Sequence, residues 1–158
     1  MKILVFTEGT VLKHSSDDKF KDYASYIPAG EAVKKLETWV ENGAEISYLT
    51  SRVKFAEIKQ IKDVLKKFNF PEGAVHARQE GETYKAVVEA LKPDVFVEDD
   101  CQSIGAEEMA TPKLNSELGI KGIVVPEFGG IGHLPDNPEE LKILGEKEAA
   151  GAVKDDTY

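Results

Sequence analysis

The sequence contains little cysteine and no long apolar run. Cys101 is its one cysteine, which excludes an internal disulfide framework. The apolar residues at the start of the chain, within residues 1–6, give way to polar ones at Thr7. This stretch is too short for the core of a secretory signal peptide or for a membrane span. We therefore expect a cytoplasmic protein without a membrane-spanning segment.

Positive charge is also scarce. Lysine and arginine together number 20 against 29 aspartate and glutamate residues, which gives a formal net charge of −9. No lysine- or arginine-rich run offsets this balance. Because nucleic-acid backbones and anionic lipid surfaces bind to basic faces, we expect neither a nucleic-acid nor a membrane partner.

Short apolar runs alternate with segments of helical periodicity. The five runs expected to be strands are residues 3–6, 46–49, 74–77, 95–97 and 123–125. The helical faces between them are marked by Val33, Leu36 and Val40, by Ile58, Ile61, Leu65 and Phe68, and by Tyr84, Val87, Val88 and Leu91. One or two short helices are expected within residues 102–118. The alternation predicts an α/β fold, a three-layer Rossmann-like parallel sheet with helices on both faces.

The size of the chain indicates one domain. A chain of 158 residues that is 41% hydrophobic buries about two thirds of its unfolded surface and folds without a metal or a disulfide. We place the domain at residues 1–144, with a short helix beginning at Pro138. Residues 145–158 are predicted to form a loosely held acidic tail, whose charge is explained by solvation.

Polar residues follow most of the expected strands. In an open parallel sheet, ligands bind at the carboxyl ends of the strands. Residues 7–10, 50–52 and 98–100 occupy such positions, and Lys85 adds a cation near the start of a helix. Hydroxyls, an ammonium group and adjacent carboxylates suit a phosphate group bound with Mg²⁺.

These motifs resemble those of the haloacid dehalogenase (HAD) superfamily, a family of mostly Mg²⁺-dependent phosphatases, over about residues 1–126. The family pattern Asp-x-Asp-Gly-Thr aligns with residues 6–10, and Thr50 matches the hydroxyl residue that ends the second strand. Lys85 matches the family's lysine, and Asp99 and Asp100 match its acidic pair. The resemblance implies the strand order 3-2-1-4-5. The short separation between the first two motifs leaves no room for a large cap, and capless members admit large substrates.

The resemblance also implies roles for individual residues. Asp99 and Asp100 would hold Mg²⁺, and Thr50 would bind the phosphoryl group while Lys85 steadies its charge. Glu8 stands where the family has its general acid. The residues expected to be catalytic are Glu8, Thr50 and Lys85, and those expected to bind substrate are Gly9, Thr10 and Ser51.

The first motif departs from the family at its most important position. Phe6 stands where the family has the aspartate that attacks phosphorus and binds Mg²⁺, and a phenyl ring does neither. Glu8 points to the same side of an extended segment, but using it as nucleophile leaves no group to protonate the leaving group. Loss of a nucleophile costs on the order of 10⁴ to 10⁶ in turnover. We therefore expect weak or no phosphatase activity towards a phosphorylated small molecule or macromolecule.

Other interpretations remain open. The chain is alternatively a noncatalytic ligand-binding or protein-interaction module on a HAD scaffold. Asp99 and Asp100 also suit the start of a helix, and Thr50 and Ser51 suit helix N-caps. A receiver-type signalling domain fits less well, because it needs its acidic pair after the first strand and its lysine after the fifth. Cys101 beside two aspartates is not expected to act as a nucleophile.

Overall fold

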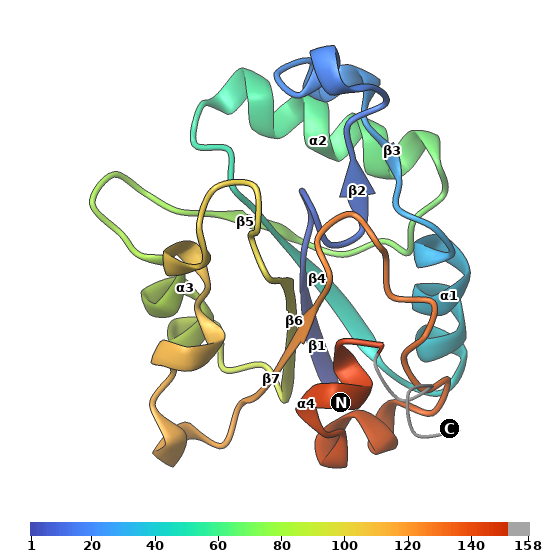
Figure 1. The fold of residues 1–158 in the computed structure, drawn as a ribbon, viewed down its shortest axis with the longest axis vertical. Helices are drawn as coiled ribbons and strands as arrows, with labels where there is room; N and C mark the ends of the chain where they lie inside the picture. Colours follow the sequence, from blue (N-terminus) through green and yellow to red (C-terminus); the bar gives the residue numbers. More distant parts are fainter. Residues whose placement is uncertain (152–158) are drawn as a thin grey trace.

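A computed structural model of the chain describes residues 1–151. Five parallel strands form a central sheet in the order β5-β4-β1-β6-β7 (Figure 1). Counted along the chain within this sheet, the order is third, second, first, fourth and fifth. The strands are β1 (Lys2–Phe6), β4 (Glu45–Thr50), β5 (Val75–Ala77), β6 (Val95–Asp99) and β7 (Lys121–Val125). The predicted α/β class with a parallel sheet flanked by helices is confirmed.

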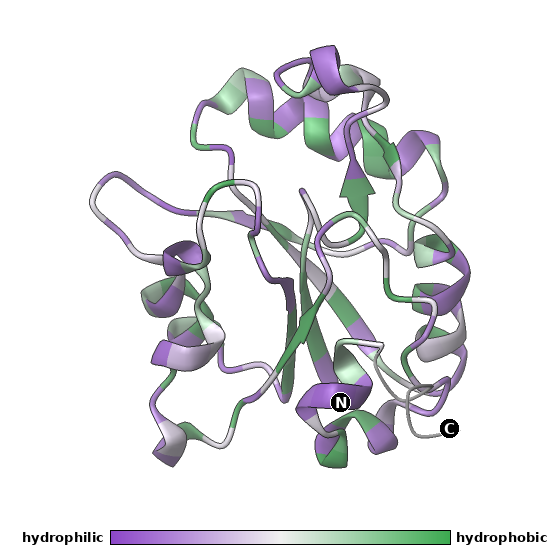
Figure 2. Ribbon diagram, in the orientation of Figure 1, coloured by the Kyte–Doolittle hydropathy of each residue, from purple (hydrophilic) through white to green (hydrophobic). Residues whose placement is uncertain are grey.

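The helices cover both faces of the sheet because side chains alternate between the faces along each strand. Ile3 and Val5 belong to the larger core, which α1 (Ala32–Glu41) and α2 (Phe55–Lys67) complete. Leu4 and Phe6 belong to a smaller core under α3 (Tyr84–Leu91). Figure 2 shows apolar residues along the central strands and alternating hydropathy along the helices. Among residues 1–151, no helix is both long enough and apolar enough to cross a membrane.

Two connections differ from the sequence prediction. Residues 102–118 contain short 3₁₀ turns, η3 (Ala106–Glu108), η4 (Thr111–Lys113) and η5 (Ser116–Leu118), where short helices were expected. The poorer hydrogen-bond geometry of a 3₁₀ helix limits such runs to about one turn, and Gly119, with a φ of +69°, ends η5. The polar stretch after β1 contains η1 (Asp17–Lys19), η2 (Tyr23–Ser25) and an antiparallel pair, β2 (Leu12–Lys13) and β3 (Ile27–Pro28).

The segment after the fifth strand packs on the sheet domain. The helix expected from Pro138 is the 3₁₀ helix η6 (Pro138–Ile143), and α4 (Glu146–Ala149) lies beside β7. Ala149 is 4% exposed, and its carbonyl oxygen lies 2.6 Å from Nε2 of His133. The first part of the segment expected to be a tail is therefore in contact with the domain. The remainder of that segment, 152–158, lies outside the described residues.

Candidate functional site

The ends of four strands meet at one edge of the sheet and line a cavity of about 410 Å³. Its wall includes residues one or two positions after the ends of β1, β4, β6 and β7, among them Glu8, Ser51, Cys101 and Glu127. Parallel pairing brings these ends together, because each crossover returns the chain to the same starting edge. The cavity therefore lies where the sequence predicted a ligand site.

The Glu8 carboxylate accepts three hydrogen bonds at this edge. The hydroxyl of Thr50 donates to Oε2 over 2.5 Å. The backbone amide of Ser51 and the hydroxyl of Thr7 donate to Oε1 over 2.9 and 2.6 Å. Thr50 is fully buried. The groups predicted to bind a phosphate are thus already paired with a carboxylate of the same chain.

The Asp99 side chain is fixed by its neighbours. Thr10 donates its hydroxyl to Oδ1 over 2.7 Å, and the backbone amide of Cys101 donates to Oδ2 over 3.1 Å. Thr10 is fully buried, so it positions Asp99 and does not face the cavity. Gly9 has a φ of +91°, and a Cβ atom there would lie 2.7 Å from Oδ1 of Asp99. Of the residues expected to bind substrate, Ser51 and Gly9 line the cavity and Thr10 supports it.

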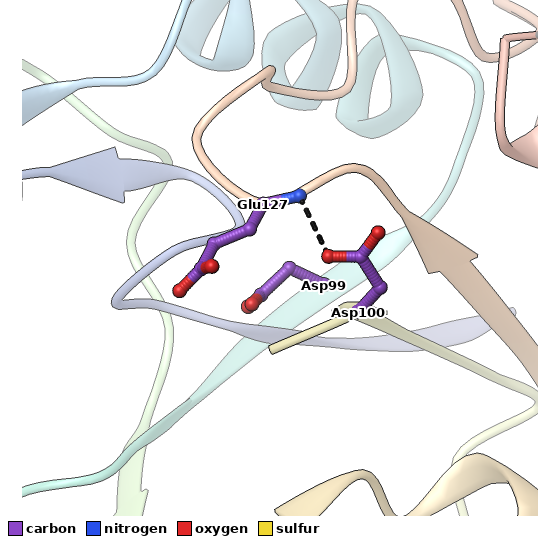
Figure 3. A group of neighbouring side chains, drawn as sticks. All are labelled: Asp99, Asp100 and Glu127. Carbon is purple, nitrogen blue, oxygen red and sulfur yellow. Dashed lines mark hydrogen bonds between the residues drawn. The ribbon is translucent and has the colours of Figure 1, made fainter. Parts of the chain in front are cut away.

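Three carboxylates converge beside this cavity. Asp99, Asp100 and Glu127 each offer an oxygen atom, and these atoms lie within 4.8 Å of one another (Figure 3). The Glu127 amide donates to Oδ1 of Asp100 over 3.2 Å. The Glu127 carboxylate accepts hydrogen bonds from the amide and the hydroxyl of Ser103, over 2.7 and 2.6 Å. Hard, anionic oxygen donors of this kind fit Mg²⁺.

The electrostatics of the cluster also fit a cation. Asp99 is 3% exposed, and burial raises the pKa of its carboxyl group above the ordinary value, with the charge of Glu127 adding to the effect. A divalent cation beside these carboxylates would favour their ionised forms. Glu127 was not predicted from the sequence, although it is a polar residue that follows the fifth strand just after Pro126, as the predicted site residues follow the other strands.

Glu98, the first acid of the run that ends β6, has a different role. Its carboxylate accepts hydrogen bonds from the backbone amides of Ala110 and Thr111, over 3.0 and 2.6 Å. Burial raises its pKa. Glu98 therefore anchors the start of η4 against the sheet.

Lys85 is not brought to the cavity. It is the second residue of α3, and its ammonium group donates to Oε1 of Glu89, one turn along, over 2.9 Å. It lines a separate depression beside α3. The cations that line the central cavity are Lys21 and Arg52. This corrects the predicted placement of the site's positive charge, because the rotation of α3 directs Lys85 along its own helix.

Arg52 is held in place at the cavity wall. Its guanidinium group lies over the ring of Tyr23, 4.4 Å from the centroid, and donates to the Tyr23 hydroxyl. It also donates to Oγ of Ser51 over 3.2 Å and lies 3.6 Å from Oε1 of Glu57. The sequence offered a signal for this cation, since Arg52 comes two residues after the end of β4.

The Phe6 ring lines the cavity. It occupies the position at which the sequence lacks an attacking carboxylate. It meets the Tyr84 ring edge to face, with centroids 5.2 Å apart. Neither ring is a nucleophile or a Mg²⁺ ligand. The chemistry that this edge offers is therefore binding by carboxylates, hydroxyls, amides and Arg52. No protein-family model, curated protein or solved structure matches the chain.

Proposed function

We propose that the chain is a HAD-like protein that binds Mg²⁺ and a phosphorylated ligand at the carboxyl edge of its sheet and hydrolyses phosphomonoesters weakly or not at all. The observation that carries the proposal is the convergence of Asp99, Asp100 and Glu127 beside the donors of Thr50 and Ser51. The order of the five strands is the order that the HAD resemblance implies. The segment between β1 and α1 holds two 3₁₀ turns and a two-stranded pair, which is consistent with a capless member.

Mg²⁺ would be held by Asp99, Asp100 and Glu127, and when bound it would supply positive charge to neutralise phosphoryl oxygens. Thr10 holds Asp99 in position, and Ser103 holds Glu127. The carboxylates at this edge repel an anion, so we expect the cation to be required before a phosphate binds.

The Thr50 hydroxyl and the Ser51 amide would then bind the phosphate, which requires the Glu8 carboxylate to leave them. Phosphate and Glu8 therefore compete for the same donors. Weak hydrolysis follows, because Phe6 supplies no attacking atom and the Glu8 oxygens are engaged as acceptors. Even a displaced Glu8 acting as nucleophile leaves the leaving group without a positioned acid.

A second candidate is a protein-interaction module that uses the same edge. Two apolar side chains that line the cavity, Phe20 and Ile104, are 53% and 69% exposed. Exposed apolar groups at the opening of a cavity favour contact with a larger partner. This candidate needs no Mg²⁺, so cation binding separates it from the first.

The test is Mg²⁺ titration by calorimetry, together with Mg²⁺-dependent hydrolysis of an aryl phosphate. The variants are Glu8→Gln, Asp99→Asn and, as a matched control, Asp63→Asn, which changes an exposed carboxylate on α2 that pairs with Lys59. We expect saturable Mg²⁺ binding that Asp99→Asn weakens about tenfold or more and Asp63→Asn leaves unchanged. We expect turnover close to the blank in all proteins.

Two outcomes would overturn parts of the proposal. Wild-type protein that neither takes up Mg²⁺ nor changes its melting temperature with Mg²⁺ has no cation site, and the interaction module is then favoured. Turnover above the blank that both Glu8→Gln and Asp99→Asn abolish would show that Glu8 performs the missing chemistry.

A further inference from the structure

Aromatic side chains make up much of the cavity wall. Rings that line it include Phe6, His14, Tyr23, Tyr26, Tyr84 and Phe128. They come from separate parts of the chain: the end of β1, the excursion between β1 and α1 (residues 7–31), the start of α3 and the loop after β7. At about 410 Å³, the cavity has the size of a small-molecule site. The rings contact one another and the guanidinium groups of Arg52 and Arg78, and a phosphate with a metal ion would not use the parts of them that face the cavity.

The rings lie on both sides of the sheet edge. Phe6 belongs to the core under α3, and Tyr84, the first residue of α3, packs against that core. Tyr26 belongs to the core on the opposite face, and Tyr23 packs against it. Figure 1 shows the excursion with β2 and β3 and the helix α3 on different sides of the strand ends. A flat group entering the cavity therefore meets ring surface from two directions.

The rings are supported from behind by other protein groups. Arg78, which does not line the cavity, has its guanidinium group 3.9 Å from the centroid of the Tyr84 ring. The Tyr26 hydroxyl donates to the carbonyl oxygen of Phe20 over 2.6 Å. Burial raises the pKa values of Tyr26 and Tyr84 to about 12, so both rings are uncharged at neutral pH. Fixed, neutral rings give a preorganised stacking surface.

The polar part of the wall is rich in hydrogen-bond acceptors. Glu108 and Glu127 line the cavity together with Glu8 and Asp99. An ionised carboxylate accepts hydrogen bonds and donates none. The complementary ligand is a planar ring that carries N–H donors. Glu8, Asp99 and Glu127 already accept hydrogen bonds within the protein, so the carboxylate that a ligand's N–H donor would meet is the exposed Glu108. A ring that is negatively charged, or an apolar ring without donors, would leave Glu108 desolvated without a partner.

We propose that the cavity binds the amino-bearing heterocyclic base of a nucleoside monophosphate between its aromatic walls. The placement of the phosphate end at the carboxylate cluster rests on the function proposed above, whereas the placement of the base rests on the rings and on Glu108. Every base offers a flat face for stacking on aromatic side chains. A single nucleotide makes no demand for the long basic groove that a nucleic-acid strand needs.

The test is calorimetric titration with adenosine, adenosine 5′-monophosphate and ribose 5-phosphate, each with and without Mg²⁺. Adenosine should bind saturably in both conditions. Mg²⁺ should strengthen the binding of the two phosphorylated compounds and leave the binding of adenosine unchanged. Tyr84→Leu and Phe128→Leu should each weaken adenosine binding about tenfold, whereas Tyr84→Phe, which keeps the ring, should preserve it. Phe55→Leu is the control, because Phe55 is 84% exposed on α2 and does not line the cavity.

The two proposals fail in different ways. If adenosine does not bind in either condition, or binds Tyr84→Leu and Phe128→Leu as well as wild type, the base site is overturned whatever Mg²⁺ does. If adenosine binds and the ring variants lose it while ribose 5-phosphate shows no Mg²⁺ dependence, the base site stands and the proposed phosphate site is overturned. Melting curves of each variant establish that a loss of binding is not a loss of folding.

Discussion

Glu8 holds an unusual position for an acid at the edge of a sheet, because its carboxylate is the acceptor for groups that would otherwise bind a ligand. The Thr50 hydroxyl is fully buried and the Ser51 amide is partly buried. When Glu8 is removed, water therefore does not fully replace its carboxylate as the acceptor for these two donors. Leaving a buried donor without an acceptor costs about 1–3 kcal/mol. Glu8 therefore contributes to stability and at the same time opposes the binding of an anion.

Glu8→Ala should lower the free energy of unfolding by about 1–3 kcal/mol. With Mg²⁺ present, added phosphate should raise the melting temperature of the variant more than that of wild type, since the freed donors can take an anion. The measurement is chemical denaturation, followed by thermal melting across a phosphate titration. Glu57→Ala is the control, because Glu57 is a partly exposed partner of Arg52 whose loss should cost less than about 1 kcal/mol. Equal phosphate responses in wild type and Glu8→Ala would show that Glu8 does not occupy an anion site.

Cys101 is placed so that its thiol stays protonated. Burial raises its pKa to about 12, and the charges of Asp99 and Glu98 add to the effect. At pH 8 only about one thiol in ten thousand is then ionised, so alkylation by iodoacetamide should be slower than in the unfolded chain by on the order of a hundredfold or more. Mg²⁺ bound beside Asp99 would lower this pKa and speed the reaction. Equal rates for folded and unfolded protein would contradict the placement of the thiol.

The turn after β1 depends on one glycine for two separate reasons. Gly9 has a φ of +91°, which strains any residue with a Cβ atom, and that atom would lie 2.7 Å from Oδ1 of Asp99. Gly43, which follows α1, has a similar φ of +94° but has no atom within 4 Å of such a Cβ. Comparing alanine substitutions at Gly9 and Gly43 therefore distinguishes the effect of backbone strain from the effect of a clash with Asp99.

Gly9→Ala should destabilise the protein by more than Gly43→Ala, for which about 1 kcal/mol is expected from strain alone. It should also weaken Mg²⁺ binding, because Asp99 must move to make room, whereas Gly43→Ala should leave Mg²⁺ binding unchanged. Denaturant unfolding and Mg²⁺ calorimetry on both variants provide the measurement. Equal losses of stability with unaltered Mg²⁺ binding would mean that the Asp99 side chain yields without cost.

At the scale of elements, periodic segments were predicted well and short irregular ones were not. The helices α1, α2 and α3 could be predicted from the sequence because three or more apolar residues recur at helical spacing in each. The pair β2 and β3 has two residues per strand, which is too few to show any period. The turn η4 depends on Glu98, which is distant in sequence, to accept the amides of Ala110 and Thr111. The local residue pattern of a segment does not indicate a contact with a residue so distant in the sequence.

At the scale of the whole molecule, the location of the site could be predicted because parallel pairing sends every strand end to one edge. The direction of individual side chains could not. The position of Lys85 near a helix start is compatible with many rotations of α3, and the structure directs it to Glu89. The aromatic walls were also hidden, because rings far apart in sequence, such as Tyr23 and Tyr84, come together only after the excursion past β1 folds over the strand ends.

The extent of the folded domain can be tested at α4. Ala149 is 4% exposed beside β7, whereas the next residue, Ala150, is exposed. If the segment that begins at 145 is part of the domain, Ala149→Asp places an unpaired carboxylate against the sheet and should lower the free energy of unfolding by about 2 kcal/mol or more. Ala150→Asp adds the same charge to the chain at an exposed position and should cost less than about 0.5 kcal/mol. Denaturant unfolding of both variants is the measurement. Equal stability of the two would show that α4 detaches without cost and that the domain ends before it, since the added charge is the same and only the packing against β7 differs.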